Sequence, residues 1–302
     1  MAPAVTGAAG AEHEEQVELL RWGERERRDL PWRHTRDPWA VLVAEVMAQQ
    51  TQVERVVPAW RDLLRRWPDP AAMASAPLSE VLGAWHGLGY PRRARHLWEA
   101  ARRITELHDG RVPTEVAELL ELPGIGPYTA RAVRAFAHEL DAAVVDTNVG
   151  RVLARRAGRR LTPREAQAAA DDWLPAGRAW EWNQTLLDLG ALRCRPRDPD
   201  CDGCPVARGC AWAAAGRPEP DPAAGSAGVS RRQARFEGSR RQARGRLLRA
   251  ATAAPLPPQR WVEVAGWGDR PDAEVAVGEV ARSLVADGLA ALDPQGCLVP
   301  PD

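Results

Sequence analysis

The 302-residue sequence contains no lysine, because all 41 of its basic residues are arginine. A lysine amine is the side chain that forms Schiff bases with carbonyl carbons, so the chain has no side-chain amine for that chemistry. Arginine resists deprotonation and recognises phosphate well. The formal net charge is zero, which leaves any nucleic-acid binding to local basic patches rather than to a global field.

The sequence also lacks a long apolar run. No stretch approaches the length that spans a bilayer, and the first thirty residues do not show the basic-then-apolar order of a signal peptide. A composition of 45% apolar and 27% charged residues is typical of soluble globular proteins. We therefore expect a cytoplasmic protein that makes no contact with a membrane.

The chain divides into four segments by pattern. Residues 1–10 are small and featureless, and we expect them to be disordered. Residues 11–215 show apolar positions at three- and four-residue spacing, which predicts an all-α domain. Residues 216–229 are rich in proline, glycine and alanine and predict a linker with little to bury. Residues 230–302 form a smaller unit.

The smaller unit has its own pattern. Helical stretches near 240–253 and 273–287 precede two short strands around a DPQG turn, which is compatible with a winged-helix-like α+β domain. Arg231 to Arg249 contains eight arginines and one acid, Glu237. With opposing charge nearly missing, we expect this segment to contact DNA phosphates, the alternative being a solvated helix face.

Four of the five cysteines fall within seventeen positions: Cys194, Cys201, Cys204 and Cys210. In a cytoplasmic protein such a group binds metal far more often than it forms disulfides. The short, unequal gaps favour one loop wrapped around a 4Fe-4S cluster, with zinc as the alternative. Cys297 lies in the expected hairpin and is interpreted as a small apolar residue.

Two acidic residues stand out. Glu45 is the one ionisable side chain in the run WAVLVAEVMAQQTQV, residues 39–53, where an unpaired charge costs several kcal/mol. It is therefore a satisfied structural contact or part of a site. Asp146, in VVDTNVGRV, precedes an expected helix and is suited to cap it. Between them LPGIG, residues 122–126, predicts a turn joining two helices, whose backbone can come close to a phosphate.

Six short motifs lie within residues 15–215. In chain order they are LPWR (30–33), EVMAQQTQV (45–53), GLGY (87–90), LPGIGPYTA (122–130), VDTNVGRVLAR (145–155) and WNQTLLDLGA (182–191). Together with the four cysteines, they resemble the MutY-type adenine DNA glycosylases of the helix-hairpin-helix, iron-sulfur superfamily. The resemblance implies excision of adenine mispaired with 8-oxoguanine or guanine in duplex DNA, as a step of base excision repair.

The resemblance also implies a fold. Residues 36–140 would form a six-helix barrel with the helix-hairpin-helix, and residues 11–35 and 141–215 a helical subdomain with the cluster loop 194–210. It further implies one 4Fe-4S cluster, a monomer, duplex DNA containing an adenine mispair as the partner, and a location at the nucleoid within the cytoplasm. Other repair proteins as partners leave no motif in the sequence.

The implied reaction needs an acid for the base and an anion for the sugar. The adenosine must first be flipped out of the duplex. Adenine leaves once its imidazole-ring nitrogen is protonated, and Glu45, with a pKa raised by an apolar wall, suits that role. Asp146 is expected to stay ionised at its helix start and to stabilise the oxocarbenium-like sugar. By resemblance, Tyr128 lies beside this pair and Asn148 orients water or the carboxylates.

The resemblance carries over further DNA contacts. The residues expected to enter the base stack are Gln50 and Tyr90, with Thr51 beside Gln50. The adenine pocket would be lined by Trp32, Arg33 and Gln184. A phosphate would accept hydrogen bonds from the amides of Gly124 and Gly126, and the DNA backbone beside the cluster would meet Arg195 and Arg197. For Trp32 an alternative is open, since it is one of thirteen tryptophans and could simply belong to the core.

Relatives within the superfamily provide the alternatives. Endonuclease III-type enzymes cut the strand with a lysine in the turn after the hairpin, where this chain has Tyr128, so the sequence predicts a monofunctional glycosylase without lysine-dependent lyase activity. A mismatch thymine or uracil glycosylase can also carry tyrosine there. A catalytically silent iron-sulfur DNA-binding regulator is the alternative from another class.

The C-terminal residues depart from well-known members of the family. Those members carry a Nudix-like domain that reads 8-oxoguanine, whereas residues 230–302 are too few for that fold. The sequence therefore predicts that a winged-helix-like domain replaces it, and leaves open how the opposite base is read.

Overall fold

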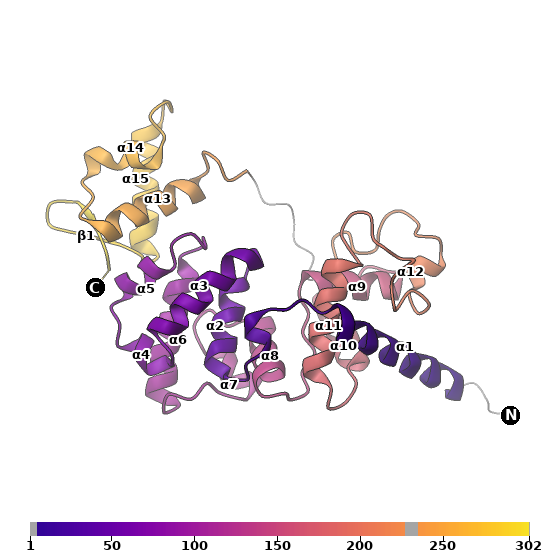
Figure 1. The fold of residues 1–302 in the computed structure, drawn as a ribbon. Helices are drawn as coiled ribbons and strands as arrows, with labels where there is room; N and C mark the ends of the chain where they lie inside the picture. The colour runs from indigo at the N-terminus through magenta and orange to yellow at the C-terminus, as the bar shows by residue number, and fades with distance from the viewer. Residues whose placement is uncertain (1–4, 227–234, 302) are drawn as a thin grey trace. The chain divides into compact units, whose positions relative to one another are not determined.

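The computed structural model describes residues 5–226 and 235–301 and is helical over most of that length (Figure 1). The chain divides into two compact units, each built from two separate segments. The first unit comprises Met1–Arg36 and Gly126–Arg231, and the second comprises Asp37–Ile125 and Arg232–Asp302. No helix among the described residues is both long and apolar enough to cross a membrane.

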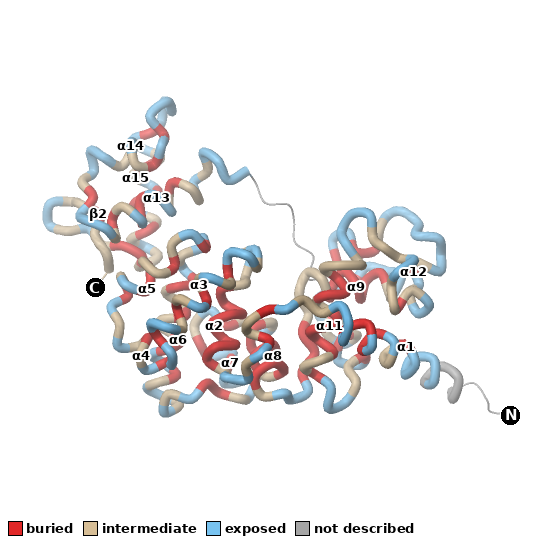
Figure 2. The backbone as a smooth tube through the Cα atoms, in the orientation of Figure 1, coloured by how far each residue is buried: buried red, intermediate tan, exposed pale blue. Residues whose placement is uncertain are grey.

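The first unit is a helical bundle. Its elements are α1 (Val5–Glu26), the 3-10 turn η1 (Pro31–Arg33), α8 (Pro127–Ala137), α9 (Thr147–Ala157), α10 (Pro163–Trp173), α11 (Ala179–Leu192) and α12 (Ala211–Ala214). Buried side chains of α1, α9, α10 and α11 form one core, and these helices carry red, buried stretches in Figure 2. Trp173 and Trp182 meet edge to face there, with ring centroids 5.0 Å apart.

Close approach of α11 to its neighbours depends on small residues. A Cβ on Gly23 of α1 would lie 2.1 Å from the hydroxyl of Thr185 on α11, so only glycine fits at that crossing. Likewise, a Cβ on Gly190 of α11 would lie 2.5 Å from the Cβ of Asn148 on α9. These two glycines therefore let α11 approach both α1 and α9 at backbone distance.

The second unit combines a helical body with a C-terminal module. Its elements are α2 (Pro38–Ala48), α3 (Val53–Arg66), α4 (Pro70–Ala74), α5 (Leu78–Ala84), α6 (Arg92–Leu107), α7 (Val116–Leu120), α13 (Arg240–Ala253), the 3-10 turn η2 (Pro258–Arg260), α14 (Trp261–Ala265), α15 (Ala273–Ala286), β1 (Ala291–Leu292) and β2 (Leu298–Val299). The long helix α6 packs on α2, α4 and α5. Its buried Leu97, Ala101 and Ile104 recur at the spacing of one helix face.

The C-terminal module, defined as residues 235–301, follows the order expected from its sequence. The predicted helices near 240–253 and 273–287 are α13 and α15, and the predicted hairpin is present, with Leu292 opposite Leu298 in antiparallel register. Leu256 adds an isolated bridge to Leu298. The module packs through α13 onto α5 of its own unit. Part of the arginine-rich segment, residues 231–234, lies outside the described residues.

Three boundaries differ from those expected. The first helix already begins at Val5, so residues 5–10 are helical and only 1–4 of the expected disordered start lie outside the description. The second helix of the hairpin, α8, belongs with the first unit because it packs on α11, so the division falls at Gly126 rather than at residue 141. The expected linker 216–229 also differs, because the chain up to Ser226 makes contacts with the first unit.

That packed stretch runs from Arg217 to Ser226. Ala223 is 3% exposed and belongs to the core of the first unit. The Ser226 hydroxyl accepts a hydrogen bond from the Leu161 amide (3.2 Å), and Asp221 forms an ion pair with Arg155. Composition alone predicted a free linker because these contacts are made with residues more than sixty positions away in the sequence. Residues 227–229 lie outside the described part.

Candidate functional site

Glu45 lies in α2, the helix that the sequence marked by its single carboxylate. The helix begins after Asp37, whose side chain accepts a hydrogen bond from the Trp39 amide (3.0 Å), and Pro38 occupies its first position. From Trp39 to Met47 every residue is buried, and Glu45 itself is 8% exposed. The buried position predicted for Glu45 is thus present.

Asp146 caps helix α9, as predicted. Its Oδ1 accepts hydrogen bonds from the backbone amides of Asn148 (2.8 Å) and Val149 (2.7 Å), and its Oδ2 accepts one from the Asn148 side-chain amide (2.9 Å). All three donors favour the anion, as does the positive end of the helix dipole. The carboxylate is therefore held in one orientation at the start of the helix.

The pKa of Asp146 depends on packing as well as on the helix cap. Burial raises the pKa of this carboxyl above its usual value of 3.8, and this effect outweighs the three hydrogen bonds and the Arg151 guanidinium, which lower it. The sequence reasoning counted the capping amides, which are local, and missed the desolvation, which comes from packing. The role of an ionised Asp146 stays a prediction, and the groups that stabilise the anion are all in place.

Arg151 links the Asp146 cap to the cysteine loop, a role that the sequence analysis missed. This arginine is 4% exposed. It donates to Asn148 Oδ1 (2.9 Å), to the Gly190 carbonyl (2.6 Å) and to the Cys194 carbonyl (2.6 Å). The same Asn148 amide that donates to Asp146 is thus fixed by Arg151. One guanidinium joins α9, α11 and the first cysteine of the loop.

Arg33, a candidate for the adenine pocket, is held by a buried carboxylate on α11. Asp188 is fully buried and accepts hydrogen bonds from both Nη atoms of Arg33 (2.7 and 3.0 Å) and from Arg28. Gln184, which is 4% exposed, lies one turn earlier on the same helix, and Trp32 is half-buried. The structure therefore brings Arg33 to α11 through Asp188, a residue that the sequence analysis did not single out.

The hairpin motif forms the turn that was predicted. It joins α7 (Val116–Leu120) to α8 (Pro127–Ala137). Gly124 has φ = 76°, and a Cβ there would lie 2.6 Å from the Cβ of His96, so the position requires glycine on both counts. Gly126 precedes Pro127, the first residue of α8, and Tyr128 is half-buried in the first turn of that helix.

The two candidate stack-entering residues share an unusual backbone. Gln50 and Tyr90 both adopt left-handed φ values, 55° and 48°, and both are exposed. A bulky residue rarely takes this conformation, which is typical of functional turns. Each therefore projects from a constrained turn, Gln50 at the end of α2 and Tyr90 just before α6.

Arg93 ties these two turns together and was also missed from the sequence. It is 8% exposed, and burial lowers its pKa to about 10. Its guanidinium donates at 2.8–3.2 Å to the carbonyl oxygens of Val46, Met47, Leu88 and Gly89 and to the Thr51 hydroxyl. Because these acceptors belong to both turns, one buried cation sets the positions of Gln50, Thr51 and Tyr90 relative to each other.

The four clustered cysteines line one pocket of the first unit. Cys194 follows α11 and Cys210 precedes α12, with Cys201 and Cys204 in the loop between them. Burial raises the pKa of the Cys204 thiol to about 12. Among the described residues, no set of three His, Cys, Asp or Glu side chains is placed so as to hold a metal ion. Cys297 belongs to the second unit.

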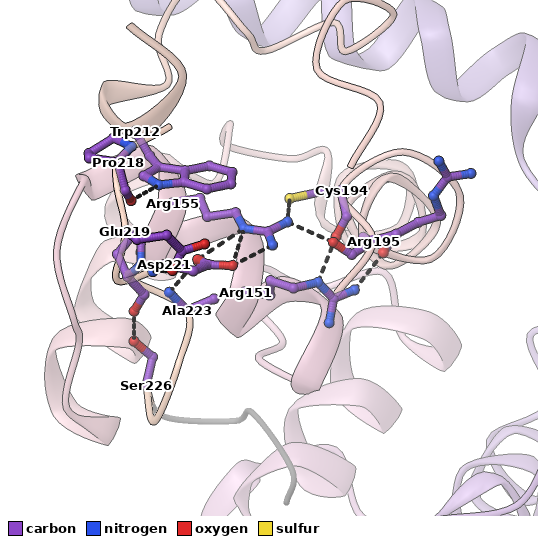
Figure 3. A network of polar contacts seen from close by, with 12 residues as sticks. Arg151, Arg155, Cys194, Arg195, Trp212, Pro218, Glu219, Asp221, Ala223 and Ser226 are labelled. Atoms are coloured by element: carbon purple, nitrogen blue, oxygen red, sulfur yellow. Dashed lines mark hydrogen bonds and ion pairs between the residues drawn. The ribbon is translucent and has the colours of Figure 1, made fainter. Parts of the chain in front are cut away.

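Arg155 is one of the arginines that line this pocket, and Figure 3 shows its contacts. It is 2% exposed, its guanidinium lies 4.6 Å from the Trp212 ring centre, and it donates to Cys194 Sγ (3.3 Å). Asp221 pairs with it at 2.6 Å. The stretch after Arg217 is therefore connected to the first cysteine through a single arginine. Arg195 and Arg197 lie exposed in the same loop.

The structure distributes the predicted site residues over both units. The first unit holds Trp32, Arg33, Gly126, Tyr128, Asp146, Asn148, Gln184 and the four cysteines, and the second holds Glu45, Gln50, Thr51, Tyr90 and Gly124. Within the first unit, Asp146 and Asn148 are in direct contact. Within the second, Thr51 and Tyr90 belong to turns joined by Arg93.

Comparison with known proteins gives consistent likenesses. A family model described as HhH-GPD superfamily base excision DNA repair protein matches residues 43–176. The adenine DNA glycosylase of Mycobacterium tuberculosis is 43% identical over 296 residues, covering 95% of this chain and 92% of that protein. The adenine DNA glycosylase of Homo sapiens is 40% identical over 204 residues, covering 62% of this chain and 37% of that protein.

Solved structures show the same fold. A thermostable thymine-DNA glycosylase matches with a TM-score of 0.66 and 30% identity, covering 69% of this chain and 99% of that one. A trapped endonuclease III–DNA covalent intermediate matches with a TM-score of 0.60 and 24% identity, covering 67% of this chain and 95% of that one. The predicted all-α, helix-hairpin-helix glycosylase fold is confirmed.

Proposed function

Because the chain belongs to the adenine DNA glycosylases of the HhH-GPD superfamily of base excision DNA repair proteins, we propose that it excises adenine mispaired with 8-oxoguanine or guanine from duplex DNA. One observation carries this proposal, namely 43% identity to an adenine DNA glycosylase over 95% of the chain. The protein would act as a monomer on DNA in the cytoplasm, at the nucleoid.

The chemistry is a hydrolysis of the N-glycosidic bond. The flipped adenine takes a proton from Glu45 on its imidazole-ring nitrogen and leaves with the electron pair of the bond to C1′. Asp146 stabilises the resulting oxocarbenium-like sugar. Water then adds its oxygen to C1′ and gives up a proton, which restores the acid form of Glu45. The burial of Glu45 and the three donors to Asp146 support these roles.

The remaining candidates bind and orient the DNA. Asn148 fixes Asp146, and Tyr128 lies in the turn where lyase relatives carry a lysine, so release occurs without strand cleavage. Gln50 and Tyr90 enter the stack with Thr51 beside Gln50. The flipped adenine is bound by Trp32, Arg33 and Gln184. The backbone amides of Gly124 and Gly126 contact a phosphate.

The four pocket cysteines would hold one 4Fe-4S cluster. The residues fit such a group, because its ligands are thiolates and its negative charge is offset by cations, which Arg155 and Arg151 supply beside Cys194. When bound, the cluster would stabilise the loop from Cys194 to Cys210. Arg195 and Arg197 of that loop would then face the DNA backbone.

The decisive experiment is a single-turnover assay on a duplex with adenine opposite 8-oxoguanine, analysed before and after alkali. We expect an alkali-labile site without prior strand cleavage. Glu45→Gln should lower the rate about 100- to 10,000-fold, the range for loss of a general acid, while DNA affinity is kept. Glu54→Gln, the same change at an exposed position of α3, is the control. Full turnover by Glu45→Gln would refute the role of Glu45.

A thymine- or uracil-directed activity is not favoured, because the identity to an adenine DNA glycosylase is 43% over 95% of this chain and that to a thymine-DNA glycosylase is 30% over 69%. The same assay on thymine and uracil opposite guanine discriminates it. Release of thymine or uracil without release of adenine would replace the adenine assignment. A duplex left intact after alkali, with undiminished DNA binding, would identify a regulator without catalytic activity.

A further inference from the structure

A side chain of the C-terminal module contacts a candidate stack-entering residue of its own unit. Arg241 of α13 donates a hydrogen bond from Nη1 to the hydroxyl of Tyr90 (3.0 Å). The same guanidinium lies 5.8 Å from the ring centre of Phe236, which is 57% exposed. The cation therefore lies within reach of two exposed aromatic rings, and one of these rings is at the candidate site.

Without such a contact, Tyr90 would be poorly ordered. Its turn has positive φ at Gly87 (90°), Gly89 (75°) and Tyr90 itself (48°), and the side chain is 36% exposed. Arg93 fixes the backbone of this turn from the buried side and lies 5.7 Å from the ring centre. That arrangement leaves the hydroxyl end of the ring to be held from elsewhere, since an exposed ring samples several staggered rotamers.

The module is anchored so that it can hold that end. Asp287, after α15, accepts a hydrogen bond from Arg244 of α13 (2.6 Å) and lies 3.8 Å from Arg92 of α6. The Asp287 carbonyl also accepts a hydrogen bond from Arg95 of α6. Gly288 has φ = 61°, which favours glycine, and a Cβ there would lie 2.0 Å from the Arg95 guanidinium. Arg241 is thus presented by a helix that is fixed to the same α6 that begins beside Tyr90.

We propose that the C-terminal module positions Tyr90 for entry into the DNA stack, with Arg241 as the positioning residue. Arg241 holds the Tyr90 ring in one rotamer before DNA arrives, and the entropy of ordering the ring is then not lost at the flipping step that follows binding. This inference rests on the proposed function, since it takes the stack-entering role of Tyr90 from it. It assigns residues 235–301 a part in base flipping.

A double-mutant cycle tests the contact in the full-length protein. The variants are Arg241→Ala, Tyr90→Phe and the combination of both. The readouts are the single-turnover rate of adenine release, the fluorescence of 2-aminopurine next to the adenine as a measure of flipping, and the Kd for the same duplex. Each single variant should lower rate and flipping about fivefold, the value of one hydrogen bond, with Kd nearly unchanged. The double variant should be no slower than either single one.

Two further variants separate positioning from charge. Arg241→Lys, which can still donate to the hydroxyl, should recover part of the flipping signal. Arg282→Ala removes the same charge from an exposed position of α15 and should match the wild type. Two results would overturn the proposal. One is that the effects of Arg241→Ala and Tyr90→Phe multiply in the double variant while Arg241→Ala alone weakens Kd, which would show a phosphate contact. The other is that Arg241→Ala flips the base as well as the wild type does. Failure of the wild type itself to release adenine would instead refute the proposed function.

Discussion

At the scale of residues, buried arginines hold the candidate groups in place. Arg33, Arg93, Arg151 and Arg155 are each at most 8% exposed, and each donates to groups on more than one element. A planar guanidinium has five donors in fixed directions, which a lysine ammonium does not provide. In a chain without lysine, arginine therefore supplies the cross-links between helices as well as the surface charge.

Asp146 gives a prediction for pH dependence. Burial raises its pKa above 3.8, so the ionised fraction falls as the pH drops through that raised value. The excision rate should therefore decline on the acid side at a higher pH than an exposed carboxylate would give. Asn148→Ala keeps the Cβ that packs on Gly190 but removes a donor that lowers this pKa.

In Asn148→Ala the acid limb of the single-turnover rate profile should move to higher pH. The rate at pH 7 should fall about tenfold, since a hydrogen bond to a charged group is lost. Thr147→Ala, on the adjacent position of α9, is the control and should leave the limb in place. An acid limb that is the same in Asn148→Ala and the wild type would show that another group titrates there.

At the scale of elements, α11 carries the polar contacts of the first unit. Gln184 and Asp188 lie one turn apart on it, and Gly190 gives α9 its close approach. Asp188 is a fully buried anion, and its cost is offset by Arg33 and Arg28. The helix therefore holds η1, the turn with Trp32 and Arg33, against the rest of the unit.

Asp188→Asn should lower the free energy of unfolding by about 3 kcal/mol at pH 7, the cost of leaving buried Arg33 without its anion. Burial raises the pKa of the Asp188 carboxyl, but the hydrogen bonds and positive charges of Arg33 and Arg28 lower it by more. The pKa of Asp188 is therefore lowered from its usual value of 3.8. A carboxyl whose pKa is lower in the folded than in the unfolded state stabilises the fold at every pH above the unfolded-state pKa. This contribution is lost only as the pH falls below that value. Urea unfolding should therefore show a constant difference from about pH 7 to pH 5, and a difference that shrinks over that window would contradict the pairing.

At the scale of the whole molecule, features that depend on neighbouring residues could be predicted from the sequence. Contacts between residues far apart in the chain could not. The burial of Glu45 follows from a continuous apolar run, and the Asp146 cap follows from its place before a helix. Asp188 and Arg151 gave no such signal, because their partners lie up to 160 positions away in sequence. The desolvation that raises the pKa of Asp146 gave no such signal either, since it comes from packing.

Distant pairing also explains the stretch after Arg217, where composition predicted a linker. Asp221 neutralises the buried Arg155, which in turn donates to Cys194. Where the catalytic domain ends is therefore decided by one ion pair rather than by proline and glycine content. Any removal of the C-terminal module should be made after Ser226, so that this pair is kept.

Two truncations test that boundary. A chain ending at Ser226 should keep the iron and the visible absorbance of the proposed 4Fe-4S cluster, because Arg155 and Asp221 remain paired. A chain ending at Gly216 leaves a 2% exposed cation without its anion, which costs about 3 to 5 kcal/mol, and should lose iron and unfold at lower temperature. The full-length variant Asp221→Asn should resemble the shorter truncation, and Asp202→Asn, at an exposed position of the loop, should not. Equal iron content in both truncations would place the end of the domain before Arg217.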